Sequence, residues 1–201
     1  MNANFSTFRI LTAIKLLAIY FVAKLILLTR YDTARFISGK WFRGGKYGRF
    51  TGTGWKWVLD DYFSCGRMKV NKAVPWPCSP RIGIIYPENI NFHPDDLNNF
   101  QGFGNYYQAI GKITIGRGTY IAPNVGIITS NHSIDNLDLH DQPQPVTFGE
   151  RCWIGMNSVI LPGVTLGEHT IVGAGSVVTR SFPEGYCVIG GNPARLIRNL
   201  K

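Results

Sequence analysis

The chain has 201 residues and a formal net charge of +9, a length that allows one domain and a modest extension. The charge is uneven, because residues 1–72 hold thirteen Lys and Arg against three Asp, whereas residues 73–201 hold eight against nine acidic residues. The C-terminal part therefore lacks the basic surface that nucleic-acid binding requires, and we expect no nucleic-acid partner. The positive field lies in the N-terminal part, where it favours an anionic membrane surface.

Residues 1–35 are predicted to form an apolar helix flanked by basic residues. Residues 10–28 are apolar except for Thr12, Lys15 and Lys24. In a helix this stretch spans about 28 Å, close to the thickness of a bilayer core. We favour a membrane-embedded or re-entrant anchor. A helix packed against a neighbouring subunit and a signal peptide stay open, although no small-x-small cleavage site follows the apolar run.

Residues 36–80 are predicted to be a connecting region, basic and aromatic and rich in Gly and Pro. Interleaved Trp, Tyr, Lys and Arg suit the headgroup level of a membrane. The alternative is stacking of single-stranded nucleic acid, which the preceding apolar segment disfavours. Pro75, Pro77 and Pro80 forbid a helix there and favour an extended connection at its end.

Residues 81–201 are predicted to form a parallel β-helix, because apolar residues recur at every sixth position. The run is Phe148, Ile154, Ile160, Leu166, Val172 and Val178. An even spacing keeps one side of a strand facing inward, whereas the same spacing drifts around a helix. Short strands and glycine corners at a fixed period stack as coils. The register also runs backward through Ile127, Ile121, Ile115, Ala109 and Phe103.

The repeat fails once, between Ile127 and Phe148, where the gap of 21 residues is not a multiple of six. Residues 131–147 are polar and are predicted to form a loop extruded from the coil, with His132 at its root. Loops held by a rigid scaffold often carry chemistry. An imidazole that titrates near neutrality can serve there as a general base.

The cysteines and the other histidines show no metal-binding pattern. Cys65, Cys78, Cys152 and Cys187 form no CxxC pair, and we expect free thiols in a reducing compartment. Cys152 occupies an inward position of the repeat, which argues against an acyl-carrying nucleophile. The four histidines lack zinc-ligand spacing, so no metal is predicted.

Four stretches resemble the hexapeptide-repeat acyltransferases, in particular the branch that O-acetylates sugars and polysaccharides. They are residues 113–132, 148–167, 169–183 and 190–198. Residues 92–104 further resemble enzymes of bacterial surface-polysaccharide assembly. The resemblance implies an all-β fold, a left-handed parallel β-helix preceded here by the N-terminal apolar helix. It also implies a homotrimer with active sites between subunits and acetyl-CoA as co-substrate.

The resemblance also assigns site residues. It places Asn131 and His132 in the catalytic site, with His132 as the base, and the Gly155-Met156 corner as the main-chain donor to the oxyanion. The residues matching positions that contact the acyl-CoA are Trp153, Gly155, Met156, Ala174, Thr179, Arg180, Arg195 and Arg198. Arginine suits bidentate contact with phosphates.

The acceptor side departs from the family pattern. The positions where sugar-acetylating relatives carry an asparagine and an aspartate fall on Gly102 and Ile110, with Asn105 as the nearest substitute for a substrate contact. Together with the apolar N-terminus, this favours a membrane-tethered glycan acceptor and a cytoplasmic enzyme at the inner face of the cell membrane. Three alternatives stay open: an acetyltransferase for an amino sugar or an amino acid such as serine, a non-catalytic membrane-associated β-helix scaffold, and a nucleic-acid binder.

Overall fold

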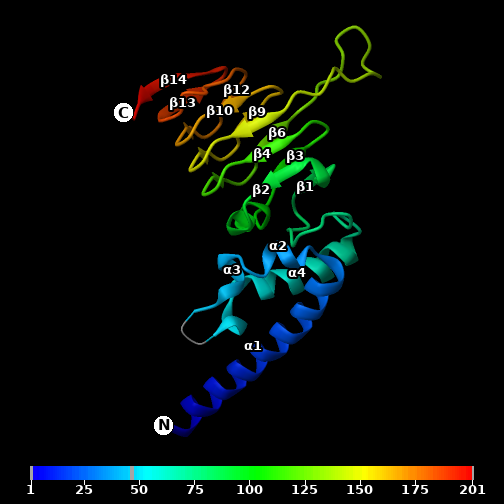
Figure 1. Cartoon of the computed structure of the whole chain (residues 1–201), viewed down its shortest axis with the longest axis vertical. Helices are drawn as coiled ribbons and strands as arrows, with labels where there is room; N and C mark the ends of the chain where they lie inside the picture. The colour runs from blue at the N-terminus through cyan, green and yellow to red at the C-terminus, as the bar shows by residue number, and fades with distance from the viewer. Residues whose placement is uncertain (1, 46–47, 201) are drawn as a thin grey trace. The chain divides into compact units, whose positions relative to one another are not determined.

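The computed structural model describes residues 2–45 and 48–200, with side chains from residue 10 onward, and it divides into two compact units (Figure 1). The first unit is Met1–Pro80 and the second is Arg81–Lys201. The first is helical and the second is built from short strands. The prediction of an all-β fold is therefore wrong for the N-terminal unit.

The N-terminal unit packs a long helix against a shorter one. Its elements are α1 (Asn2–Arg30), α2 (Thr33–Phe36), α3 (Lys40–Arg43), the 3-10 turn η1 (Arg49–Thr51) and α4 (Thr53–Met68). Trp55 lies at the centre of its core, with its ring 4.8 Å from that of Tyr20 and 5.0 Å from that of Phe42. Its indole N–H donates to the Arg49 carbonyl at 2.7 Å, so this large side chain is buried without an unpaired polar atom. The region predicted as a connection thus contains α3 and α4.

Helix α1 contains the one described segment that is long and apolar enough to cross a membrane, by length and composition. This segment is Ile10–Arg30, with a mean hydropathy of 2.2 and only 11% of its window buried. Most of its exposed apolar side chains recur every three or four residues and therefore lie along one side of the helix, with Leu11 and Val22 exposed beside them: Ile10, Ile14, Leu17, Phe21, Leu25 and Leu28. Ala23, Ile26 and Leu27 are buried.

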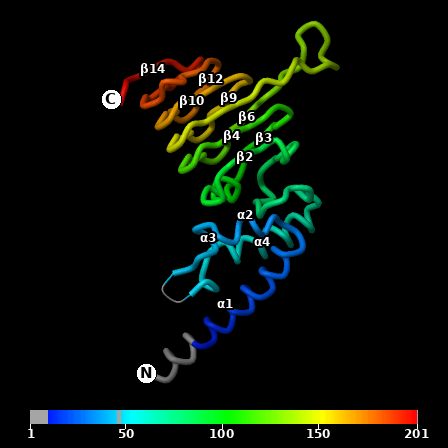
Figure 2. Tube along the Cα trace, viewed as in Figure 1, coloured from blue at the N-terminus to red at the C-terminus, as the bar shows by residue number. Residues whose placement is uncertain are grey.

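The C-terminal unit is a parallel β-helix with three faces (Figure 2). The first face holds β1 (Gly83–Ile85), β3 (Tyr106–Gln108), β6 (Gly126–Ile128), β9 (Val159–Ile160) and β12 (Val177–Val178). The second holds β2 (Ile90–Phe92), β4 (Ile113–Ile115), β7 (Val146–Phe148) and β10 (Thr165–Leu166). The third holds β5 (Tyr120–Ile121), β8 (Trp153–Ile154), β11 (Ile171–Val172), β13 (Cys187–Gly191) and β14 (Ala194–Asn199). From β4 to β12 the chain visits the second, third and first face in turn, and β13 and β14 then both join the third face.

Pairing within each face is parallel, with one exception at the end of the stack. Strand β14 runs antiparallel to β13 and lies at the edge of the third face. Near the other end, the turns η2 (Pro87–Asn89) and η3 (Pro94–Phe100) interrupt the first coils. The regular coils therefore begin after η3 and end before β14.

The predicted inward residues fill the core. The six repeat residues from Phe148 to Val178 are each at most 1% exposed, which confirms the six-residue register. Running backward, Ile127, Ile115 and Ala109 are also buried. Phe103 is 44% exposed, so that prediction is wrong. It lies in a bend after η3, before a closed coil exists, and the Arg81 guanidinium covers its ring at 5.7 Å.

Glycine corners let successive coils approach closely. A Cβ added to Gly155 would lie 2.6 Å from both the Ala174 nitrogen and the Val172 oxygen of the next coil. Hydroxyl groups at buried corner positions donate to main-chain carbonyls. Ser158, for example, donates to the Gly173 carbonyl of the next coil at 3.1 Å. The corners are therefore held in place by main-chain packing, and their outward N–H groups have fixed directions.

Candidate active site

The extruded loop leaves the coil after β6 and returns at β7 (Figure 1). Its stem is fixed by Gln108 of the coil below. The Gln108 side-chain oxygen accepts from the N–H groups of Thr129 and Ser130, each at 3.1 Å. Across the stem, the Asp141 N–H donates to the Asn131 carbonyl at 2.9 Å. The loop therefore begins from a rigid base, as expected for a segment that positions a reactive group.

His132 lies where the loop starts, and its ring is oriented by the loop itself. Its Nδ1 lies 2.7 Å from the Leu137 carbonyl oxygen. A carbonyl only accepts hydrogen bonds, so Nδ1 carries a proton, and in the neutral imidazole Nε2 keeps a lone pair. The His140 ring packs against it, with centroids 4.3 Å apart. His132 is exposed, so Nε2 is accessible to an incoming hydroxyl.

Three groups are candidates to orient His132: Asp95, Asp96 and a main-chain carbonyl. Both carboxylates have structural contacts elsewhere. The Asp95 carboxylate pairs with Arg117 at 3.3 Å, and the Asp96 carboxylate accepts from the Gly118 N–H at 2.9 Å. His140 lies in the same polar loop, and the sequence gives no signal that it contacts His132. Only the folded loop, which forms a bridge between residues 132 and 140, places its ring beside His132.

Asn131 and Asn105 differ in their access to a substrate. Asn131 is exposed beside His132, and its carbonyl is used in the loop stem. Asn105 is 2% exposed. Its side-chain oxygen accepts from the Val125 N–H at 3.2 Å, and its amide donates to the Tyr107 hydroxyl at 3.4 Å. The prediction that Asn105 contacts the acceptor is therefore corrected, because this amide ties two coils together inside the core.

The Gly155-Met156 corner presents main-chain groups at the junction of the third and first faces. The Gly155 N–H donates to the Val172 carbonyl at 2.9 Å, and the Met156 carbonyl accepts from the Gly175 N–H at 2.8 Å. Among the described residues no main-chain acceptor is found for the Met156 N–H. Ala174 is exposed at the same corner one coil further on. The corner can thus offer one N–H to an external oxygen.

The remaining predicted donor-site residues are all exposed. Trp153 is 55% exposed on the third face, between Tyr120 and Ile171 of the neighbouring strands. Thr179 and Arg180 follow β12, and the Arg180 guanidinium lies 5.3 Å from the centre of the Phe182 ring. Two further exposed cations lie on β14: Arg195 and Arg198.

The predicted residues fall at different corners of the coil. His132, Thr179 and Arg180 follow strands of the first face, whereas Met156 and Ala174 precede strands of that face. The structure therefore brings Gly155, Met156 and Ala174 together on one edge and His132 to another. One chain alone does not gather the whole predicted set at one corner.

Nucleophilic and metal chemistry find little support in the described residues. Burial raises the pKa of the Cys152 thiol, and its sulfur contacts the Gly167 carbonyl at 3.2 Å inside the coil. A neutral, inward thiol is a poor nucleophile. Within the described ranges, no group of three or more His, Cys, Asp or Glu side chains could hold a metal ion.

Comparisons with known proteins agree with this architecture. The family model for bacterial transferase hexapeptide (six repeats) matches residues 145–180. A candidate acetyltransferase of Staphylococcus aureus (strain MRSA252) is 36% identical over 148 residues, which cover 72% of this chain and 69% of that protein. The galactoside O-acetyltransferase of Escherichia coli (strain K12) is 39% identical over 92 residues, which cover 44% of each chain.

A solved structure shares the fold. It is a hexapeptide-repeat-containing acetyltransferase from Vibrio cholerae O1 biovar eltor complexed with acetyl-CoA, with a TM-score of 0.53 and 30% identity over 61% of this chain and 66% of that one. The chain spans between 44% and 63% of the length of the first four curated relatives that it matches. The three-faced parallel coil agrees with the expected left-handed β-helix. Its six-residue register, its glycine corners and these similarities together show that the chain belongs to the hexapeptide-repeat family of bacterial transferases.

Proposed function

We propose that the chain is an O-acetyltransferase that moves the acetyl group of acetyl-CoA to a sugar hydroxyl. A relative named for galactoside O-acetylation and a solved relative with acetyl-CoA support this reaction class. The observation that carries the proposal is the Nδ1 contact of His132 with the Leu137 carbonyl, because it leaves Nε2 as an accessible base.

In the proposed reaction the acceptor attacks the thioester directly. Nε2 of His132 takes the proton of the hydroxyl as its oxygen bonds to the acetyl carbonyl carbon. The Met156 N–H stabilises the oxyanion that develops on the carbonyl oxygen. When the carbon–sulfur bond breaks, the imidazolium returns its proton to the departing CoA thiolate. The products are the acetylated sugar and CoA thiol, so no enzyme nucleophile is needed.

The acetyl-CoA would extend along the exposed corner residues. In this proposal the exposed Trp153 and Ala174 flank the path of the pantetheine, and the buried Gly155 lets the path approach the main chain between them. Thr179, Arg180, Arg195 and Arg198 would meet the nucleotide and its phosphates, because arginine forms paired hydrogen bonds with phosphate oxygens. All four side chains are exposed, which this role requires.

The proposed active unit is a homotrimer. His132 and the Met156 corner lie at different corners of one coil, so a neighbouring subunit is the natural source of the second half of each site. The loop tip carries apolar side chains that a neighbour could cover: Ile134 at 94% exposure, Leu137 at 71% and Leu139 at 58%. Apolar side chains exposed to this degree in one loop are typical of a contact surface.

The proposed place of action is the inner face of the cell membrane. The apolar Ile10–Arg30 segment and the basic N-terminal unit support attachment to an anionic surface. A glycan precursor tethered to that membrane, such as one for a surface polysaccharide, then meets the enzyme without diffusing in solution.

The test is release of CoA thiol from acetyl-CoA by the full chain in detergent, with separate acceptors. We expect His132→Ala to lower kcat/KM by about 10²- to 10⁴-fold, the usual contribution of a positioned base. The matched control is His169→Asn, at a half-buried corner in the same unit whose positive φ asparagine tolerates and whose ring stacks on that of Tyr186. Its rate should equal that of the wild type.

The acceptors decide the substrate class. Release that requires a membrane glycolipid extract and fails with soluble sugars supports the tethered glycan. If thiol release requires an amino sugar or serine instead, the acceptor is that compound and not a sugar hydroxyl of a glycan. A wild-type chain that neither binds acetyl-CoA nor releases thiol with any acceptor would be a scaffold, and the proposal would be wrong.

A further inference from the structure

The N-terminal unit contains a cavity of about 410 Å³ that the acetyl-transfer proposal does not use. It lies at the end of α1, where Arg30 and Tyr31 form part of its wall, and the last turns of α4 form another part. Its volume lies within the range of small-molecule sites, about 300–1,000 Å³, and exceeds what one phosphate ion fills. The cavity therefore suits an ionic group attached to a larger body.

The chain builds this cavity by reversing direction after α4. Lys69 caps the helix in the left-handed conformation, and its N–H donates to the Cys65 carbonyl. The Asn71 side chain donates to the Ser79 carbonyl at 3.1 Å, which ties the returning segment in place. This turn carries Lys72 back to the cavity, opposite the helix from which it departed.

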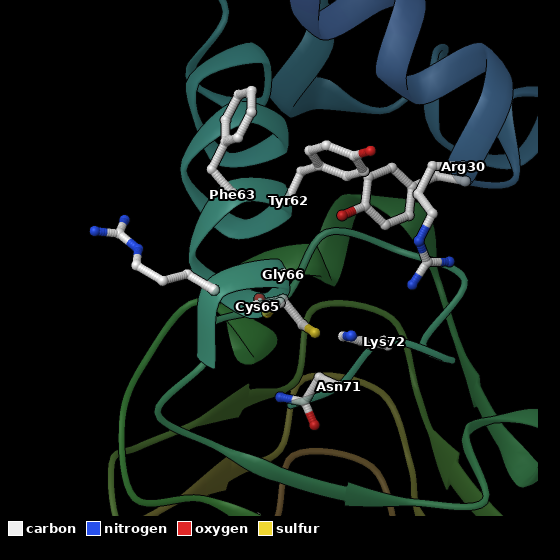
Figure 3. Close-up of a pocket in the computed structure, with 10 residues that line it drawn as sticks. Arg30, Tyr62, Phe63, Cys65, Gly66, Asn71 and Lys72 are labelled. Atoms are coloured by element: carbon white, nitrogen blue, oxygen red, sulfur yellow. The ribbon is translucent and has the colours of Figure 1, made fainter. Parts of the chain in front are cut away.

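Cations line the cavity, and none of the described residues in its wall carries a carboxylate. The three cations come from separate parts of the sequence: Arg30, Arg67 and Lys72. Figure 3 shows Arg30 and Lys72 on the same side of the cavity, with Tyr62 extending from α4 toward them. Like charges gathered in one place repel, and a bound anion relieves that repulsion.

One acidic group outside the wall acts on the residues that form it. Asp61 is buried in α4 and acts on Tyr31, Cys65 and Cys78 through its charge. Burial raises the pKa of Tyr31, so its phenol stays neutral and available as a hydrogen-bond donor. One carboxylate against three cations leaves the cavity positive.

The position of the cavity along the chain points to a lipid. The apolar segment ends at Arg30, and 21 helical residues cover about 31 Å, the thickness of a bilayer core. Arg30 and Tyr31 then fall at headgroup depth. Tyr62 and Phe63 of the wall are 40% and 56% exposed, and exposed aromatic side chains are typical of the same level.

We propose that this cavity binds the anionic phosphate headgroup of a membrane lipid, with Arg30 and Lys72 contacting the phosphate and Tyr31 and Tyr62 enclosing the rest of the headgroup. Arg67 adds to the positive field. The site is independent of the acetyl-transfer chemistry. It would fix the enzyme to lipids of one charge class rather than to the membrane in general.

The test places the full chain in nanodiscs of phosphatidylcholine, with or without phosphatidate. The readout is the alkylation rate of Cys65, which lines the cavity and whose Sγ donates to the Cys78 carbonyl at 3.3 Å. Peptide mass spectrometry separates it from Cys152, the internal reference in the other unit. The ratio of the two lipids retained after detergent extraction is a second readout.

We expect phosphatidate to slow Cys65 alkylation several-fold in the wild type and to be enriched among the retained lipids. Arg30→Gln/Lys72→Gln should abolish both effects. The matched control, Arg49→Gln/Lys56→Gln, removes the same charge from exposed positions outside the cavity and should behave as the wild type.

Three results would overturn the proposal. The first is equal alkylation with and without phosphatidate in the wild type. The second is an equal loss of phosphatidate protection in both double variants, which would mean that the effect comes from the surface charge in general and not from the cavity. The third is protection by inorganic diphosphate in phosphatidylcholine discs without any effect of phosphatidate, which would make the ligand a soluble anion. CoA-thiol release by the same preparations reports on acetyl transfer separately.

Discussion

A main-chain carbonyl, and not a carboxylate, orients the candidate base. The Leu137 oxygen fixes the tautomer of His132 at 2.7 Å without placing a full negative charge beside the ring. In the proposed reaction a dipole alone would stabilise the imidazolium, which would favour prompt return of the proton to the leaving thiolate. The stacked ring of His140 further limits rotation of His132.

Met156 can be tested through its N–H without altering the corner. Asn157 has a φ of 61° and Gly163, after Pro162, has a φ of 78°, so the two corners share a turn whose first central position accepts proline. Met156→Pro therefore removes the donor and keeps the backbone. We expect kcat to fall about 10²- to 10³-fold, as for other lost oxyanion donors.

The measurement compares kcat with the dissociation constant for acetyl-CoA. A fall in kcat with unchanged acetyl-CoA binding and circular dichroism supports the oxyanion role. An unchanged kcat would remove Met156 from the mechanism.

At the scale of elements, the repeat was predictable and the loop interior was not. A period of six fixes which side chains of β7 to β12 face inward, because strand alternation is local. Phe103 was predicted to face inward because the same spacing continues as far as this residue. It lies instead in a bend that precedes the first closed coil, and it is exposed. The partner of His132 depends on how residues 132–140 fold back, and no local pattern encodes that contact.

The helices of residues 36–80 were missed for a different reason. Helix α4 contains a glycine near its start, which weakens a helical pattern in the sequence. In the structure Gly54 is buried under the Phe42 ring, where an added Cβ would lie 2.9 Å from the ring carbons. The glycine is therefore a packing requirement of the helix pair, and only the tertiary structure reveals it.

Gln108 is expected to be a positioning residue for the loop. Gln108→Ala would leave the N–H groups of Thr129 and Ser130 without their acceptor, and the stem that carries His132 would shift. A displacement of about 1 Å can cost up to 10²-fold in rate, so we expect kcat to fall by about tenfold or more. The assay is CoA-thiol release.

Gln108→Glu provides the conservative rescue. Its carboxylate accepts from both N–H groups and should restore most of the rate. Equal loss of rate in both variants would mean that Gln108 acts otherwise than through these two hydrogen bonds.

At the scale of the whole molecule, the proposed site requires more than one chain. If each site takes His132 from one subunit and the Met156 corner from the next, His132→Ala and Met156→Pro should complement each other. Random assortment in mixed trimers gives about a quarter of the wild-type sites. The measurement is thiol release after the two inactive variants are co-expressed.

A sizing control accompanies the complementation. Light scattering of the protein component in detergent should give three times the chain mass of 22.5 kDa. Mixed trimers with no activity would place both groups within one subunit and contradict the shared site.

The antiparallel strand β14 has a consequence for how many coils can stack. Every parallel coil exposes an edge on which another identical coil could grow, so nothing within the repeat itself ends the series. By folding back along β13, β14 pairs that last edge with a strand of opposite direction. A further coil would therefore lack a parallel partner on the third face. The same strand that is proposed to hold CoA phosphates thus closes one of the three edges on which separate molecules could continue one another into a fibre.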